Sequence, residues 1–362
     1  MEAVRIGVIG LGEVAQIIHL PILQSLNDKF RIVALCDVSP SLLKAVGERY
    51  SISSLYEDVN DLVQQKDVDA VLVANSDEYH ADSVIAALRN HKHVLVEKPM
   101  CLNLADAEAI RKARDESGAK VMVAYMRRFA PAFTTAVKMV RELDKILYVR
   151  VRDIIGQNRL IIEQSSNVLR FDDIPERFKA DRVARAERMV KDAVGAVPPE
   201  LARVYRLLCG LSSHDISAMR ELIGIPKRIL SAVQWNGGSC LLATFDYGDF
   251  CVGFETAIDQ QRAFDAHIQI YSPHKSLTVQ YDSPYIRHLP TTLVVRETIG
   301  ESYNETVIRP TFKDPYTFEL EEFYEVVTGK KPIKTTVEDA MEDLRIFQMF
   351  VHTLVSQTLG AQ

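Results

Sequence analysis

The sequence has 362 residues, of which 47% are hydrophobic, and this supplies enough apolar side chains for two ordinary domain cores. Its net charge of −6 and its pI near 5.9 argue against a nucleic-acid or anionic-membrane partner, because both need a basic surface. No apolar run approaches the ~20 residues of a membrane span, and the first residues lack a signal-peptide pattern. We therefore expect a cytoplasmic protein that acts on small molecules.

The cysteines are scattered along the chain and none forms a CxxC pair. This spacing predicts neither a metal site nor a disulfide framework, which agrees with a reducing compartment. The positions are Cys36, Cys101, Cys209, Cys240 and Cys251.

From residue 4 to residue 124, short apolar runs alternate with segments of helical period, as is typical of a parallel sheet covered by helices. Asn103, with Asp106 three residues later, predicts the cap of the last of these helices. The predicted strands are 4–9, 31–36, 70–73, 93–96 and 120–124, and the predicted helices are 42–50, 59–65, 83–90 and 104–117.

After residue 125 the pattern changes to strict alternation, with turn residues at 236–238 and 247–249 that predict hairpins of an antiparallel sheet. The predicted strands are 146–154, 229–235, 241–247, 251–257, 266–271 and 293–299, and the predicted helices are 175–194, 199–208, 216–223, 317–328 and 337–357. We expect an α/β domain over 1–125 and an α+β domain with an open, mainly antiparallel sheet over 126–362.

A glycine pattern follows the first predicted strand directly, in the run Gly10-Leu11-Gly12-Glu13-Val14-Ala15. The first glycine suits a tight turn, the second lets a pyrophosphate approach the backbone, and Ala15 allows the helix to pack closely. The N-terminus of the helix then offers oriented N–H groups to phosphates. The pattern predicts a dinucleotide site in a Rossmann domain, and the simpler alternative is an ordinary strand-to-helix turn.

Asp37 ends the second predicted strand, where a carboxylate can accept hydrogen bonds from the hydroxyls of an adenosine ribose. The same carboxylate repels a 2′-phosphate, and no arginine follows at once. We therefore expect NAD in preference to NADP. The alternative is that Asp37 only caps the helix that begins near Ser41.

Three further motifs stand at predicted strand ends: the segment 75–80, the run Glu97-Lys98-Pro99 and the segment 124–129. With the glycine pattern they make the chain resemble the glucose-fructose oxidoreductase, inositol dehydrogenase and rhizopine-catabolism (Gfo/Idh/MocA) family. The resemblance covers nearly the whole chain, including the closing helices.

The resemblance implies an NAD-binding Rossmann domain joined to a substrate-binding and oligomerisation domain, and a homodimer or homotetramer. It implies hydride transfer between the nicotinamide and a secondary alcohol of a sugar, glycoside or cyclitol. The implied cofactor-binding residues are Gly10, Gly12, Glu13, Val14, Asp37, Ala74, Asn75, Ser76, His80, Glu97 and Lys98. The implied substrate-binding residues are Lys98, Tyr125, Arg127 and His214.

Lys98 is the first of two expected catalytic residues. By the resemblance it contacts both the nicotinamide ribose and the substrate hydroxyl, and the Lys98-Pro99 bond is cis. Partial burial beside a cationic nicotinamide disfavours the ammonium form, which would bring the pKa of Lys98 into a range useful for proton transfer. The simpler alternative is a solvated lysine at a strand end.

His214 is the second expected catalytic residue. Many members of the family carry an Asp four residues before this His, but here that position is Gly210. His214 could instead cap the helix that starts near Ile216. Asp215 does not replace the missing carboxylate by default, because an acid in a first helical turn is already explained by the helix dipole.

Other polar residues leave alternatives open. Arg127 and Arg128 could bind an anionic substrate group or pair with surface acids, whereas Tyr125 and His80 suit positioning roles. The segment 156–204 is longer than the family usually carries there, and we expect a solvated helix, a lid or an oligomer arm.

Two other functions remain open. A few relatives in the family use transient NAD oxidation to cleave glycosidic bonds, and such an enzyme returns its hydride. The chain could also be a catalytically silent NAD-binding regulator, which Gly210 favours and the intact Lys98 disfavours.

Overall fold

The computed structural model describes residues 3–360, which form two compact units. The first unit contains Met1–Ala124, Ser166–Gly195 and Glu319–Leu344. The second unit contains Tyr125–Ser165, Ala196–Phe318 and Arg345–Gln362. Each unit is therefore assembled from three segments of the chain, and the functions expected for 1–125 and 126–362 stay predictions.

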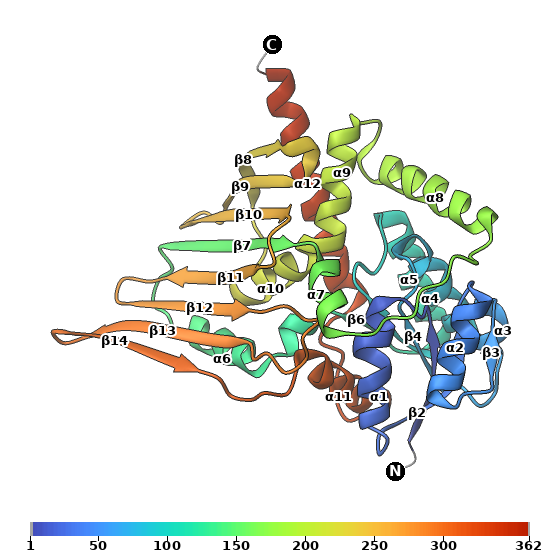
Figure 1. Ribbon diagram of the computed structural model, residues 1–362. Coiled ribbons are helices and arrows are strands. Elements are labelled where there is room, and N and C mark those ends of the chain that lie inside the picture. The colour runs from blue at the N-terminus through green and yellow to red at the C-terminus, as the bar shows by residue number, and fades with distance from the viewer. Residues whose placement is uncertain (1–2, 361–362) are drawn as a thin grey trace. The chain divides into compact units, whose positions relative to one another are not determined.

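The first unit is built on a six-stranded parallel sheet in the order β3-β2-β1-β4-β5-β6 (Figure 1). The strands are β1 (Val4–Ile9), β2 (Phe30–Cys36), β3 (Leu55–Tyr56), β4 (Ala70–Val73), β5 (His93–Glu97) and β6 (Val121–Ala124). This confirms the predicted parallel α/β fold. Because β1 lies between β2 and β4, the connections leave in opposite directions, and the order reverses where ligands of such sheets bind.

Helices connect these strands in the predicted alternation. The first begins as a π-helical segment, η1 (Ala15–His19), and continues as α1 (Leu20–Ser25). The others are α2 (Pro40–Tyr50), α3 (Val59–Val63), the 3-10 turn η2 (Asp77–Tyr79), α4 (His80–Arg89) and α5 (Leu104–Ser117). The α5 bounds match the prediction, and the Asn103 side chain accepts its capping hydrogen bond from the Asp106 N–H at 2.8 Å.

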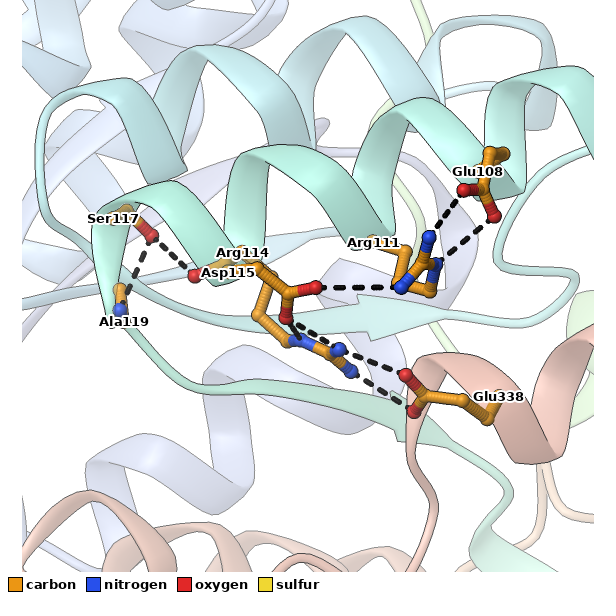
Figure 2. A network of polar contacts seen from close by, with 7 residues as sticks. All are labelled: Glu108, Arg111, Arg114, Asp115, Ser117, Ala119 and Glu338. Carbon is orange, nitrogen blue, oxygen red and sulfur yellow. Dashed lines mark hydrogen bonds and ion pairs between the residues drawn. The ribbon is translucent and has the colours of Figure 1, made fainter.

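The two later segments of the first unit contribute α8 (Glu176–Val194), most of α11 (Pro315–Val327) and the start of α12 (Val337–Gly360). Phe30 on β2 contacts the rings of Phe323 and Tyr324 at centroid distances of 6.4 and 5.8 Å. Figure 2 shows a charged network in which Arg114 on α5 pairs with Glu338 at 2.7 Å. These contacts fix the closing helices onto the Rossmann sheet.

The outer edge of β6 is covered by the chain itself. The Val123 N–H donates to the Thr335 carbonyl at 3.0 Å, and the Thr335 hydroxyl donates to the Val123 carbonyl at 2.6 Å. Thr335 is fully buried. This pairing satisfies the polar groups that an edge strand would otherwise leave open.

We expect Thr335→Val to lower the free energy of unfolding by about 1–3 kcal/mol, because it leaves a buried carbonyl without its donor. Urea denaturation measures this loss. Thr328→Val is the control, since the Thr328 hydroxyl bonds a helix carbonyl at a partly exposed site. Equal losses in the two variants would show that the hydroxyl at the β6 edge has no special role.

The second unit contains an eight-stranded sheet in the order β14-β13-β12-β11-β7-β10-β9-β8. Its strands are β7 (Tyr148–Gly156), β8 (Arg228–Trp235), β9 (Cys240–Asp246), β10 (Cys251–Asp259), β11 (Phe264–Tyr271), β12 (Lys275–Tyr281), β13 (Thr292–Ile299) and β14 (Ser302–Ile308). Only β7 and β10 pair in parallel, which confirms a mainly antiparallel sheet. Both predicted hairpins form, between β8 and β9 and between β9 and β10.

The helices of the second unit are α6 (Pro131–Arg141), α7 (Asn158–Ser165), α9 (Pro199–Leu207), the π-helical η4 (Leu208–Ser212), α10 (Ser213–Ile223) and the end of α12. Helix α6 packs on β12 and β13, and α10 packs on β7 (Figure 1). The rings of Phe245, Phe254 and Phe350 meet at 5.5–5.6 Å in the core. Among residues 3–360, no helix has both the length and the apolar character needed to cross a membrane.

Candidate active site

The structure brings the predicted cofactor residues to one edge of the parallel sheet. The residues follow the carboxyl ends of neighbouring strands: Gly10 and Gly12 after β1, Asp37 after β2, Ala74, Asn75 and Ser76 after β4, and Glu97 with Lys98 at the end of β5. Glu13 and Val14 begin the helix that continues into η1. This is the edge at which doubly wound sheets bind nucleotides.

The glycine turn after β1 has the close approach that the pattern predicts. Gly10 has a φ of +88°, and a Cβ there would lie 2.3 Å from the Asn75 backbone nitrogen. A Cβ on Gly12 would meet nothing within 4 Å, so space is open beside its backbone. The first-turn N–H groups of the following helix have no intrahelical partners, which fits a pyrophosphate at this place.

Asp37 is held in this turn by two backbone donors. The Leu11 N–H donates to Oδ2 at 2.8 Å and the Ser39 N–H donates to Oδ1 at 2.9 Å. Burial raises the pKa of Asp37 above its usual value, although both donors act in the opposite direction. The cap of α2 is Ser39, whose hydroxyl accepts from the Leu42 N–H at 3.2 Å, so the alternative that Asp37 only caps this helix is wrong.

Lys98 lies half-buried at the end of β5, and the Lys98-Pro99 bond is cis as expected. The backbone N–H of Lys98 donates to Glu97 Oε2 at 3.2 Å, and Glu97 Oε1 lies 2.7 Å from Nε2 of the buried His19. Burial alone would raise the pKa of Glu97, but the His19 hydrogen bond and the Lys98 charge lower it overall. An ionised carboxylate is therefore fixed directly next to Lys98.

His80 joins the two loops that flank this lysine. Its Nδ1 lies 2.7 Å from the Pro99 carbonyl oxygen and its Nε2 lies 3.0 Å from the Asn75 carbonyl oxygen. The ring is buried, so these contacts fix the Lys98-Pro99 turn against the loop after β4. Contact between His80 and a cofactor stays a prediction.

In the second unit, His214 lies in the first turn of α10, one residue after its start at Ser213. Gly210 belongs to η4, has no positive φ, and a Cβ there would meet nothing within 4 Å. The backbone therefore has room for the Asp that many family members carry at this position. No steric constraint accounts for the glycine.

Arg127 is buried and pairs with two aspartates, with Asp215 through Nη1 and with Asp153 through Nη2 at 3.1 Å. Its guanidinium lies 4.6 Å from the centre of the Tyr281 ring. Arg128 is also buried and pairs with Glu221 at 2.6 Å. The pairing expected for these arginines is present, but it is buried rather than at the surface, and substrate contact by Arg127 stays a prediction.

The cluster of Arg127, Asp153 and Asp215 holds two carboxylates and one guanidinium away from water. Burial raises the pKa of Asp215 well above its usual value, even though Arg127 acts to lower it. A buried site carrying an uncompensated negative charge is costly, so burial favours the neutral form of Asp215.

Replacing Arg127 by Met should therefore destabilise the fold far more than replacing Asp215 by Asn. Arg127→Met leaves buried carboxylates without a cation, a loss of about 3–5 kcal/mol. Asp215→Asn resembles the protonated carboxyl and should cost no more than about 1.5 kcal/mol. Urea denaturation at neutral pH measures both losses.

The same variants give a pH dependence. A raised pKa in the folded state means that the stabilisation is full below the unfolded value near 3.8 and is lost as pH rises through the raised value. The free energy of unfolding of the wild type should therefore fall relative to Asp215→Asn as the pH rises. A constant difference between pH 5 and pH 9 would contradict a strongly raised pKa of Asp215.

Several residues of these sites carry no signal that sequence reasoning could use. Gln16 and His19 lie on the first helix and bond partners far along the chain, at Leu169 and Glu97. Asp153 lies on a strand whose alternation predicts only that it faces inward. A buried acid on an inward face is the signal that could have indicated a buried partner.

The parallel sheet, its glycine turn and the order reversal beside β1 are features of the doubly wound domains that bind dinucleotides. Residues 4–125 match the model of the Gfo/Idh/MocA family, described as "Oxidoreductase family, NAD-binding Rossmann fold". This match over the N-terminal domain supports the resemblance seen in the sequence motifs.

Individual proteins of known name are also similar to this chain in sequence, one of them over most of its length. An inositol 2-dehydrogenase of Salmonella typhimurium is 33% identical over 127 residues, 34% of this chain and 38% of that protein. The chain thus matches well under half the length of that relative. A scyllo-inositol 2-dehydrogenase (NAD(+)) of Bacillus subtilis is 29% identical over 350 residues, covering 92% of this chain and 90% of that protein.

A solved structure supports the fold of both units. It is a variant of a 3-ketoreductase from Actinomadura kijaniata in complex with TDP-benzene and NADP. It superimposes with a TM-score of 0.71 at 17% identity and covers 96% of each chain.

Proposed function

We propose that the protein is a dehydrogenase or reductase that transfers a hydride between NAD and a secondary alcohol of a cyclitol or sugar. The observation that carries the proposal is the position of Lys98, on the same sheet edge as the Gly10 turn and Asp37. The two relatives named as inositol dehydrogenases, one of them NAD-dependent, support the cyclitol class.

The nicotinamide, when bound, supplies the hydride chemistry, and the protein binds, orients and moves protons. The turn at Gly10 and Gly12 is suited to the phosphates, and Asp37 to the adenosine ribose. Lys98 would take up or return the hydroxyl proton at Nζ. Glu97 and His80 hold the Lys98 turn in place from two sides.

His214 is proposed as a polar group for the reacting alcohol, because an imidazole can both accept and donate a hydrogen bond. The room beside Gly210 shows that an Asp is absent for reasons other than space. In this proposal Lys98 alone moves the proton, and His214 orients the hydroxyl.

Asp37→Ala should weaken NAD binding by about 10- to 150-fold, because a hydrogen bond to a charged group contributes roughly 1.5–3 kcal/mol. Isothermal titration calorimetry with NAD measures the change. Asp58→Ala is a matched control, since Asp58 caps α3 and should affect NAD affinity little. A wild-type protein that binds NADP more tightly than NAD would contradict this role of Asp37.

Lys98→Ala should reduce turnover by about 10²- to 10⁴-fold while NAD affinity stays nearly constant, as expected for a positioned proton carrier. The assay follows NADH formation with a panel of inositols, sugars and glycosides. Lys112→Ala is the control, because the Lys112 side chain is 76% exposed on α5.

The same panel separates the alternative functions. Net NADH formation supports the dehydrogenase, whereas glycoside cleavage without net NADH indicates a hydride-returning glycosidase. NAD binding with no turnover of any compound would favour a regulatory protein. Turnover by Lys98→Ala close to that of the wild type would remove Lys98 from the mechanism.

A further inference from the structure

A later segment of the chain lies against the edge of the parallel sheet that carries the predicted cofactor residues from Gly10 to Lys98. We call this edge the cofactor edge. We call residues 167–185 the strap; they belong to the part of this unit that follows β7 and α7. The Gln16 side chain bonds the strap in both directions, accepting from the Leu169 N–H at 2.9 Å and donating to the Leu169 carbonyl at 3.1 Å. Arg170 pairs with Glu13 at 2.6 Å, so the strap begins against the glycine turn.

The strap is fixed a second time where α8 begins. The Tyr79 hydroxyl donates to Asp181 at 2.8 Å, and Arg185 pairs with Asp82 at 2.5 Å. The Arg185 guanidinium also lies 4.7 Å from the centre of the Tyr79 ring. The strap is therefore attached to the loops that follow β1 and β4, on either side of the predicted dinucleotide position.

Between these attachments, Asp173 reaches the start of α2. Its carboxylate accepts a hydrogen bond from the Ser39 hydroxyl and another from the Ser41 N–H at 2.8 Å. These donors lower the pKa of Asp173 to about 2, so the side chain is ionised at any working pH.

Ser39 and Ser41 are the donors that follow Asp37 in the chain, next to the place where the 2′-position of an adenosine ribose binds in this fold. A hydroxyl together with an N–H at a helix N-terminus suits a phosphate. Here Asp173 occupies both donors. Its charge also acts on Asp37, since burial and then the nearby Asp173 charge raise the pKa of Asp37.

We propose that Asp173 is a second specificity-determining residue, which acts with Asp37 to exclude dinucleotides that carry a 2′-phosphate. The proposal rests on the proposed function, because it takes NAD as the cofactor. Asp37 alone would leave the Ser39 and Ser41 donors open to an anion. With Asp173 in place, a 2′-phosphate meets two carboxylates and loses those donors.

The test compares NAD and NADP affinities by calorimetry in the wild type and in Asp173→Asn, Asp173→Lys and Asp172→Asn. Asp172 is the matched control, because it is exposed, carries the same charge and precedes Asp173 on the strap. Hydrogen exchange of peptides spanning 167–185 verifies that the strap keeps its place in each variant.

We expect Asp173→Asn to bind NADP roughly tenfold more tightly, with NAD affinity changed by less than about threefold, because one carboxylate is removed from the phosphate position. Asp173→Lys should increase NADP affinity further. Asp172→Asn should leave the ratio of the two affinities unchanged.

Two outcomes would overturn the inference while NAD binding stands. In one, Asp173→Asn changes the NADP-to-NAD ratio no more than Asp172→Asn does. In the other, NAD and NADP weaken by the same factor, which indicates that Asp173 only attaches the strap. A wild type that binds neither dinucleotide would instead refute the proposed function, and this inference with it.

Discussion

The structure of the cofactor edge depends on the contact between two backbones, at Gly10 after β1 and at Asn75 after β4. A Cβ at Gly10 would lie 2.3 Å from the Asn75 nitrogen, so only glycine lets the turn come this close. The turn then places the Leu11 N–H on Asp37 and begins the helix that carries His19 to Glu97. The pairs that surround Lys98 and Asp37 follow from this one close approach.

The buried carboxylates of the two units have different kinds of partner. At the cofactor edge each carboxylate has donors of its own: backbone N–H groups for Asp37 and His19 for Glu97. These donors act to lower the pKa of each carboxylate and so favour its ionised form. In the second unit, Asp153 and Asp215 share one guanidinium, and burial raises the pKa of Asp215. Such a cluster suits fixing a fold more than binding an anion.

The sequence predicted the elements whose own residues carry a clear apolar pattern or a capping residue. The bounds of β1 and β4 follow from short, mainly apolar runs, and those of α5 follow from its Asn103 cap. The strand β3 has two residues and no period, and β14 lies exposed at the sheet edge, so neither has a pattern to find. The helix α6 was missed although Phe133, Val137 and Val140 mark its buried face.

Long-range pairing explains what the sequence could not predict. Asp173 bonds a serine 134 residues earlier, and Gln16 bonds a residue 153 positions later, so no local pattern indicates either contact. The unusual length of the segment 156–204 left a solvated helix, a lid and an oligomer arm all open. Whether it formed a lid, an arm or a solvated helix depended on pairs that only the folded chain brings together.

Asp215 is the acidic residue nearest in sequence to Gly210, which stands where many family members carry an Asp. Asp215 follows His214 directly, but its carboxyl is fully buried, pairs with Arg127 and has a pKa that burial raises well above its usual value. It therefore cannot supply the proton-transfer role of the absent carboxylate. Under the proposed function that role falls to Lys98, whose turn is held by Glu97 and His80.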